Sequence, residues 1–221
     1  MISFNSLDAS LAYYIKGKIG YGHIYKVKSK RAIIYVLSNF EGLLFTIKLI
    51  NGKLRSEDKY NQVYNRVLPY LNNHNTKIDF YINESLDLDN YWLSGFSDAD
   101  ASFQIKIISR LKRPLNQEIR LNFQIDQKKK EILNLIKNNL GGNIGYRKSQ
   151  DTYYYGSTNF GSAKKVINYF DKYHLQSSKY VNYIKWRKAY CLIQNRDHLT
   201  KLGLDKILKL KNTMNSKLKD I

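Results

Sequence analysis

The chain has 221 residues, 43% of them hydrophobic, and its 37 Lys and Arg against 18 Asp and Glu give a formal net charge of +19. This length allows one large domain or two similar halves, and the hydrophobic fraction is sufficient for a buried core. No run approaches the roughly 20 apolar residues that a membrane span needs, and the single cysteine, Cys191, excludes an internal disulfide framework and a cysteine-rich zinc site.

The net charge points to a polyanionic partner, and nucleic acid is the usual polyanion bound by so basic a domain. The alternative is a surface made basic for solubility, which the 19 tyrosines and the alternating polar strands disfavour. The chain is also rich in Ile, Asn, Lys and Tyr, whose codons are A/T-rich. We therefore expect an organelle-encoded, mitochondrial protein.

Residues 1–70 read as an incomplete first copy of an internal repeat. When the chain is shifted on itself by 120 or 121 residues, identical residues coincide over two strands and two helices. The coinciding pairs include Ile24 with Ile144, Tyr35 with Tyr155, Ile47 with Ile167 and Lys59 with Lys179. By this register the first copy begins only at the end of its second strand, near Ile2 and Phe4, so the sequence predicts a first half truncated at its N-terminus.

The remaining residues read as a linker and a complete second copy. Residues 71–89 show no 3.6-residue period and are rich in Asn and Asp, which is typical of a linker. From there the sequence predicts a helix at 90–100, strands at 102–111 and 117–126, a helix at 128–140 that ends at Gly141-Gly142, strands near 143–149 and 152–158, helices near 160–172 and 177–195, and a basic tail helix at 203–215.

The first helix of the second copy is the most informative stretch. Residues 92–101 read Trp-Leu-Ser-Gly-Phe-Ser-Asp-Ala-Asp-Ala, with Asp98 and Asp100 at the end of the helix and an alternating strand directly after it. A seam of small residues runs along the helix, formed by Ser94, Gly95, Ala99 and Ala101. This stretch resembles the signature helix of the LAGLIDADG homing endonucleases and group I intron maturases.

The resemblance implies an α+β LAGLIDADG fold of pseudo-repeated αββαββα units with antiparallel saddle sheets. It divides the chain into a truncated N-terminal half at 1–70, a linker at 71–89 and a complete half with a basic tail helix at 90–221. In the family two signature helices pack face to face. We therefore expect a protein or RNA partner to cover the seam of the 92–100 helix.

The resemblance also implies three candidate catalytic residues. Asp100 occupies the metal-ligand position, Gln127 the position of a water-organising polar residue, and Lys179 that of a basic residue near the scissile phosphate. Because phosphodiester hydrolysis relies on hard divalent cations held by carboxylates, Mg²⁺ is the expected cofactor if the chain is active, and none is expected otherwise. The alternative for Lys179 is a solvated lysine at a helix end. Lys59 repeats Lys179 in the first half, but Ser6 replaces Gln127.

Two strands of the second half alternate strictly between apolar and polar residues, which places one face in the core and leaves the other polar. Arg, Asn and Gln side chains on such a face can reach base edges, whereas an ordinary solvent-facing sheet would favour Thr, Glu and Lys. The candidate nucleic-acid-binding residues are Gln104, Lys106, Arg110, Arg120, Asn122, Gln124, Arg147, Lys148 and Lys28. Lysines 128–130 and the run from Lys201 to Lys219 are expected to add phosphate contacts without reading sequence.

Three functional hypotheses follow. The first is a site-specific, metal-dependent homing DNA endonuclease that is active when another chain supplies the missing signature helix. The second is a relative unable to cleave DNA alone, which binds structured RNA as a maturase or as a ribonucleoprotein component, for example in the mitochondrial ribosome. The third is a dimer paired through the 92–100 helices, which the partial first half would obstruct. We favour the second, with duplex DNA as the alternative partner, because strong charge and an intact fold without a full metal site suit a binding role.

Overall fold

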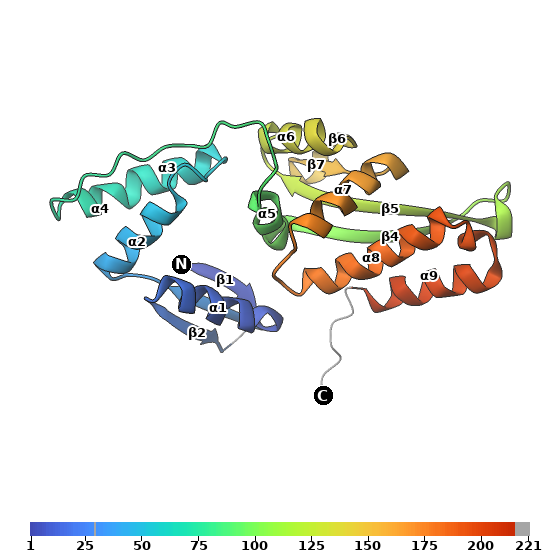
Figure 1. Ribbon diagram of the computed structural model, residues 1–221, viewed down its shortest axis with the longest axis horizontal. Helices are drawn as coiled ribbons and strands as arrows, with labels where there is room; N and C mark the ends of the chain where they lie inside the picture. The colour runs from blue at the N-terminus through green and yellow to red at the C-terminus, as the bar shows by residue number, and fades with distance from the viewer. Residues whose placement is uncertain (29, 215–221) are drawn as a thin grey trace. The chain divides into compact units, whose positions relative to one another are not determined.

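The structure is a computed structural model, and it describes residues 1–28 and 30–214. The chain divides into two compact units with the boundary between Leu86 and Asp87. Both units combine helices with antiparallel strands (Figure 1), which confirms the expected α+β class. Among the described residues, no helix is long and apolar enough to span a membrane.

The first unit contains a three-stranded antiparallel sheet in the order β1-β3-β2. Its elements are β1 (Ile2–Asn5), a 3-10 turn (Ser6–Asp8), α1 (Ala9–Ile19), β2 (His23–Val27), β3 (Ala32–Val36), α2 (Phe40–Ile50), α3 (Glu57–Arg66) and α4 (Leu68–Asn72). Ile33 and Tyr35 of β3 are buried, whereas most residues of β1 and β2 are exposed. The sheet of this unit therefore has its best-covered strand in the centre.

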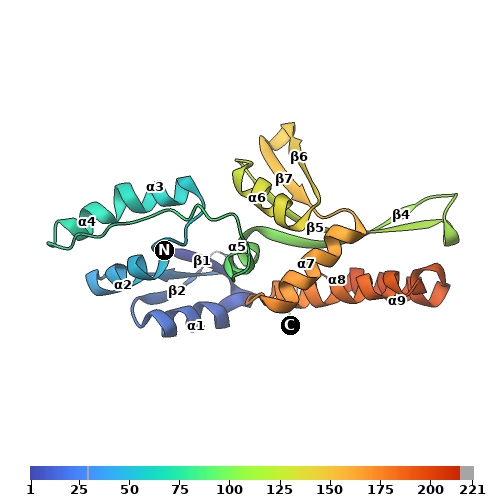
Figure 2. The ribbon, with the colours of Figure 1, turned by 45° about the horizontal axis from the view of Figure 1, so that its top comes forward.

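The second unit contains a four-stranded antiparallel sheet in the order β4-β5-β7-β6, with α7 and α8 against one face (Figure 2). Its helices and strands are α5 (Trp92–Asp100), β4 (Ala101–Ser109), β5 (Gln117–Gln127), α6 (Glu131–Leu140), β6 (Asn143–Arg147), β7 (Thr152–Gly156), α7 (Phe160–Lys172), α8 (Lys179–Gln194) and α9 (Lys201–Thr213). Three 3-10 turns complete it at Pro114–Asn116, Lys148–Gln150 and Asp197–Leu199.

The strand pairing agrees with the internal repeat. Ile24 pairs with Tyr35 in the first unit, and Ile144 pairs with Tyr155 in the second. Among the described residues β1 pairs with β3 alone, whereas the strand in its place in the second unit, β5, pairs with both β4 and β7. The division into a truncated half, a linker and a complete half stays a prediction.

One detail of the repeat alignment was wrong. Gln127 pairs with Tyr153, whose repeat equivalent is Ile33, and Ile33 pairs with Phe4. By the sheet register, Phe4 is therefore the repeat equivalent of Gln127. Ser6 lies in the 3-10 turn that follows β1. A shift of the sequence without gaps cannot show this, because the segments between equivalent strands differ in length.

The segment predicted as a linker, 71–89, belongs in part to the first unit. Leu71 and Phe80 are buried in the core of that unit. Asn51 holds the same segment, because its side-chain oxygen accepts a hydrogen bond from the backbone N–H of Tyr81 at 2.8 Å. The segment has no helical period because α4 ends at Asn72 and residues 76–89 form neither helix nor strand.

Several predicted boundaries also shift by two or three residues. The strand predicted to reach residue 111 ends at Ser109, and the helix predicted from residue 128 begins at Glu131. Three lysines in a first turn would face the positive end of the helix dipole, whereas Glu131 there is favourable. The tail helix ends at Thr213, and its predicted last residue, 215, lies outside the described residues, as does the end of the lysine run.

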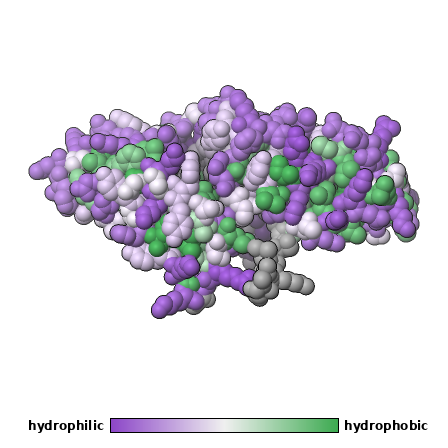
Figure 3. Space-filling view, turned by 60° about the horizontal axis from the view of Figure 1, so that its bottom comes forward, coloured by the Kyte–Doolittle hydropathy of each residue, from purple (hydrophilic) through white to green (hydrophobic). Residues whose placement is uncertain are grey.

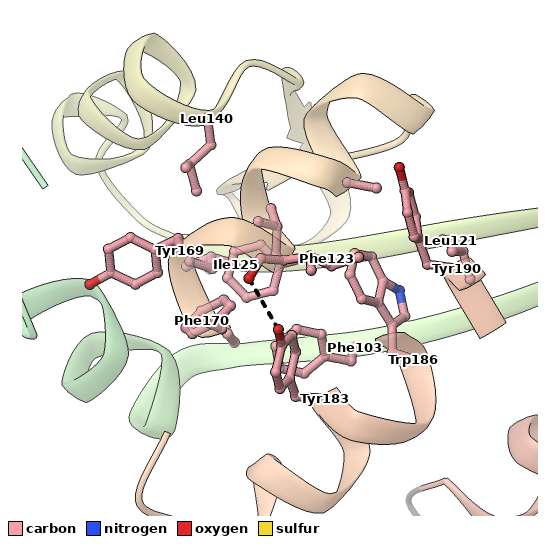
Figure 4. Close-up of a cluster of buried hydrophobic side chains, with 14 of the residues drawn as sticks. Phe103, Leu121, Phe123, Ile125, Leu140, Tyr169, Phe170, Tyr183, Trp186 and Tyr190 are labelled. Atoms are coloured by element: carbon pink, nitrogen blue, oxygen red, sulfur yellow. Dashed lines mark hydrogen bonds between the residues drawn. The ribbon is translucent and has the colours of Figure 1, made fainter. Parts of the chain in front are cut away.

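Aromatic side chains fill the core of the second unit (Figure 4). Phe103 of β4 is at the centre, with ring centroids of Phe123, Phe170, Tyr183 and Trp186 at 5.1, 5.7, 5.5 and 5.6 Å. All five side chains are almost fully buried. Because truncation of a buried aromatic residue costs several kcal/mol, this cluster fixes α7 and α8 against the sheet.

The outer surface of α8 and α9 is mostly hydrophilic with apolar patches (Figure 3). Leu202 and Leu208 of α9 are exposed there. Cys191 is half-buried and lines an apolar groove of about 480 Å³ between the two helices. It is therefore a helix-packing residue at the margin of the core.

Asp171 of α7 ties that helix to α8. It accepts hydrogen bonds from the hydroxyl of buried Tyr183 and from Arg187 Nε at 2.9 Å. Partial burial acts to raise the pKa of Asp171, but the bonds from Arg187 and Tyr183 outweigh it and hold the pKa below its ordinary value.

We expect Asp171→Asn to lower the free energy of unfolding by about 1 kcal/mol at pH 7, a value discounted because Arg187 and Asp171 are partly exposed. Because the folded-state pKa is lowered, this contribution is present above the ordinary carboxyl range and is lost as the pH falls through the folded pKa. Urea unfolding of both proteins at several pH values should show the difference closing below about pH 4. A difference independent of pH would contradict the ionic origin.

Candidate metal site and nucleic-acid interface

The site begins at the end of α5, where the helix passes into β4 without a loop. The Asn90 side chain accepts a hydrogen bond from the Trp92 N–H at 2.9 Å at the start of the helix. Ala101 has extended backbone angles immediately after Asp100. The carboxylate of Asp100 is therefore exposed at a fixed point between a helix and a strand.

The small residues of α5 lie on two different faces. Ser94 is buried against its own unit, where its hydroxyl donates to the Tyr173 carbonyl, and Ala101 is buried in the core. Gly95 and Ala99 are exposed, and a Cβ at Gly95 would have no atom within 4 Å. The seam predicted from four small residues is thus narrower, because Ser94 and Ala101 face inward.

Asp98 has its partners in the loop before α8. It accepts hydrogen bonds from the backbone N–H groups of Gln176, at 2.8 Å, and Ser177, at 3.2 Å, and from the Ser177 hydroxyl. These three donors satisfy most of what a carboxylate can accept. Asp98 is therefore a structural anchor for that loop.

Asp100, Gln127 and Lys179 come together at the end of α5. Gln127 Nε2 donates to Asp100 Oδ2 at 2.7 Å, and Lys179 Nζ donates to the carbonyls of Ala99 at 2.8 Å and Ser97 at 3.1 Å. The ammonium group thus contacts carbonyls at the C-terminal end of the helix, where the Ser97 carbonyl also accepts the Ala101 N–H. Lys179 is held in place rather than free in solvent, and the catalytic roles of the three residues stay predictions.

The donor atoms at this point suit a hard divalent cation only in part. Asp100 supplies an exposed carboxylate and Gln127 an amide oxygen, both oxygen ligands of the type that Mg²⁺ binds. Among the described residues, no group of three or more His, Cys, Asp or Glu side chains could hold a metal ion. A cation here would polarise a phosphate or water, with its remaining ligands supplied from outside these residues.

The polar face of the second unit's sheet carries the predicted amide side chains as a connected network. Asn122 Nδ2 donates to Gln104 Oε1 at 3.4 Å and to Gln124 Oε1 at 3.1 Å, and Gln124 Nε2 donates to Asp126 at 3.1 Å. Asn122 was predicted as a surface contact, but it is only 6% exposed because Gln104, Gln124 and β7 surround it. The alternation of apolar and polar residues predicted correctly which face of the sheet Asn122 occupies. It could not predict that neighbouring side chains bury this residue.

The predicted arginines of this face are paired with acids. Arg120 and Arg110 both contact Glu118, at 2.8 and 3.3 Å, and the hydrogen bond from Arg120 lowers the pKa of Glu118. Arg147 lies 3.6 Å from Asp126. Glu118 and Asp126 were not among the predicted site residues, although the alternation of β5 places them on the same face.

An aromatic side chain also lies on the polar face. The guanidinium of Arg147 lies 5.4 Å from the Tyr154 ring centroid, and a Cβ on Gly145 would overlap that ring at 2.4 Å. A side chain at Gly145 would therefore displace the Tyr154 ring. Lys148 is exposed in the turn after β6 and Lys106 is exposed on β4, whereas Lys28 is exposed at the end of β2 in the first unit.

Comparison with known proteins identifies this arrangement. Residues 93–190 match the family model described as LAGLIDADG endonuclease. The fold is that of the meganuclease I-SmaMI bound to uncleavable DNA, with a TM-score of 0.81 and 24% identity over 97% of this chain and 87% of that one. The same meganuclease has also been solved with an uncleaved DNA target in the presence of calcium ions.

Proteins similar in sequence indicate the same family. An uncharacterized cox1 intron-2 protein of Schizosaccharomyces pombe is 59% identical over 95% of this chain. The intron-encoded RNA maturase bI4 of Saccharomyces cerevisiae is 30% identical over 76% of it. The chain spans 64% and 24% of the lengths of these two proteins. It belongs to the LAGLIDADG family of intron-encoded endonucleases and maturases.

The two aspartates of α5 should respond differently to substitution. We expect Asp98→Ala to lower the free energy of unfolding by about 1–2 kcal/mol, because three donors lose their acceptor. Asp100→Ala should change it by less than about 0.5 kcal/mol, because the residue is exposed and accepts one hydrogen bond. Urea unfolding of both variants measures the difference, and equal losses would contradict the assigned structural role of Asp98.

Proposed function

We propose that the chain is an RNA-binding protein of the maturase type that does not cleave DNA by itself. The polar face of the β4-β5-β7-β6 sheet in a chain of formal charge +19 is the observation that carries this proposal. One relative is a cox1 intron-2 protein, and this similarity supports a mitochondrial location. The function of the whole protein is proposed on the same basis.

RNA suits this face better than duplex DNA for a physical reason. Gln and Asn side chains can both donate and accept, which is what recognition of a ribose 2′-hydroxyl requires. The arginines are already paired with Glu118 and Asp126. Fewer guanidinium groups are therefore available to bind guanine edges in a DNA major groove. The similarity to an RNA maturase supports the same choice.

The hydrogen bonding of the two aspartates of α5 supports binding without cleavage. Asp98 is occupied by three donors, which leaves Asp100 as the carboxylate of α5 open to a cation. Phosphodiester cleavage needs charge stabilised at both the attacking and the leaving oxygen, commonly by two metal ions. One open carboxylate provides half of such an arrangement.

The direct test is to purify the protein from its native source without nuclease and to sequence the nucleic acid crosslinked to it. We expect intron RNA, as for a maturase, or ribosomal RNA, as for a ribonucleoprotein component. Recovery of a discrete DNA site instead would overturn the RNA proposal.

Arg147→Gln should weaken RNA binding and reduce the slope of log affinity against log salt concentration by about one, because one phosphate-neutralising charge is lost. Arg66→Gln, an exposed arginine of α3, is the matched control and should leave the slope unchanged. Asp100→Asn should also leave RNA affinity unchanged. Fluorescence anisotropy over a salt series measures all three, and an unaltered slope for Arg147→Gln would exclude that contact.

The second candidate is a metal-dependent homing DNA endonuclease completed by another chain. The convergence of Asp100, Gln127 and Lys179 favours it, and the exposed Gly95–Ala99 face of α5 offers room for a closely packed helix. Under this hypothesis the chain plus its companion linearises a target plasmid in Mg²⁺, and Asp100→Asn abolishes cleavage while leaving binding intact. Linearisation by the purified chain alone would contradict the favoured function.

A further inference from the structure

A cavity of about 420 Å³ lies where β5 passes the N-terminus of α7. Among the residues that the structure describes, β7 pairs with β5 only over Gln124–Gln127, so the preceding part of β5 has no described strand on that side. The lining combines Arg120 and Asn122 of the polar face with Leu121 of the core face and Phe160 of α7. Cavities of this size that combine apolar surface with polar groups can bind small ligands.

An aromatic ring with a fixed orientation lines this cavity. Phe160 stacks on Tyr190, with ring centroids 4.1 Å apart and planes 13° from parallel. Phe160 nevertheless stays 44% exposed. Proteins stack unpaired bases on aromatic rings that are exposed and fixed in orientation by their neighbours.

Two cations face each other beside this ring. Lys106 lies directly opposite Arg120 in the pairing of β4 with β5, and both side chains line the cavity. Like charges in directly opposed positions are unfavourable unless an anion lies between them. Glu118 offsets Arg120, whereas Lys106 has no ion-pair partner among the described residues. The pair is suited to a phosphate.

One of the residues that line the cavity, Asn122, carries a buried acceptor without a donor among the described residues. Asn122 is 6% exposed, and its Oδ1 has no hydrogen-bond partner in the part of the chain that the structure describes. Its Nδ2 is engaged by Gln104 and Gln124, which fixes the amide orientation. An unsatisfied buried acceptor is costly, and an N–H donor from a ligand would satisfy it.

We propose that this cavity binds one unpaired nucleotide of the RNA held on the adjacent sheet. The base stacks on Phe160, an N–H of its edge donates to Asn122 Oδ1, and its phosphate lies near Lys106 and Arg120. The inference rests on the proposed RNA-binding function and deepens it, because it makes an unpaired nucleotide next to a helix the recognised feature. A fully paired duplex offers no base that can enter.

The test uses the full chain and three labelled RNA hairpins that differ at one position. One is fully paired, one carries a bulged adenosine, and one carries an abasic residue in the bulge, with a paired DNA duplex of the same sequence as reference. Fluorescence anisotropy should show the bulged adenosine bound about tenfold more tightly than the paired and abasic forms, as expected for stacking of one base.

Phe160→Ala should abolish the preference for the bulged adenosine and leave the affinity for paired RNA unchanged. Phe45→Ala, which removes an equally exposed phenylalanine from the first unit, should keep the preference. Because Phe160 also packs on Tyr190, the wild-type protein provides a second readout. A photoreactive 4-thiouridine in the bulge should crosslink to the segment 158–163.

Each outcome has a separate meaning. Equal affinity for all three RNAs, or crosslinks only outside 158–163, would overturn the nucleotide site while leaving RNA binding intact. Tighter binding of the DNA duplex than of any RNA would overturn the proposed function and this site with it. Loss of the preference in Phe45→Ala as well as Phe160→Ala would show a general loss of structure and remove the variant as support, leaving the crosslink to decide.

Discussion

The junction between α5 and β4 is the constraint on which the candidate site depends. The helix ends at Asp100, and the strand begins at the next residue. The bonds from Ser177 to Asp98 and from Lys179 to Ala99 join this junction to the start of α8. Phe103, three residues beyond Asp100, is in the centre of the aromatic core. The exposed carboxylate of Asp100 is therefore held in place by its connection to the buried aromatic core.

Much of this could be predicted from the sequence, because the relevant signals are local. Period-two alternation identified β4 and β5 and the face that each residue occupies. The resemblance to the LAGLIDADG family, rather than a local pattern, implied that Asp100, Gln127 and Lys179 would share one site. The glycine stop at Gly141 also ended α6 as expected. Such patterns depend on neighbours a few residues away, which a single sequence contains.

What the sequence could not give depends on distant contacts. Nothing near Asp98 shows that its partners are Gln176 and Ser177, so its structural role was not foreseen. Asn122 was predicted to be exposed, and only its contacts with Gln104, Gln124 and Gly156 show that it is covered. The seam of α5 was overestimated for the same reason, because burial of Ser94 is decided by α7.

The direct passage from α5 into β4 also has a mechanical consequence. A flexible loop between a binding surface and a reactive group would absorb any strain that a ligand applies to the surface, but none separates them here. β4 carries Gln104 and Lys106 on the polar face and continues backwards into Asp100. A ligand that bends or twists the sheet therefore displaces this carboxylate by leverage. A change in the shape of the sheet and a change in the position of the Asp100 carboxylate therefore occur together.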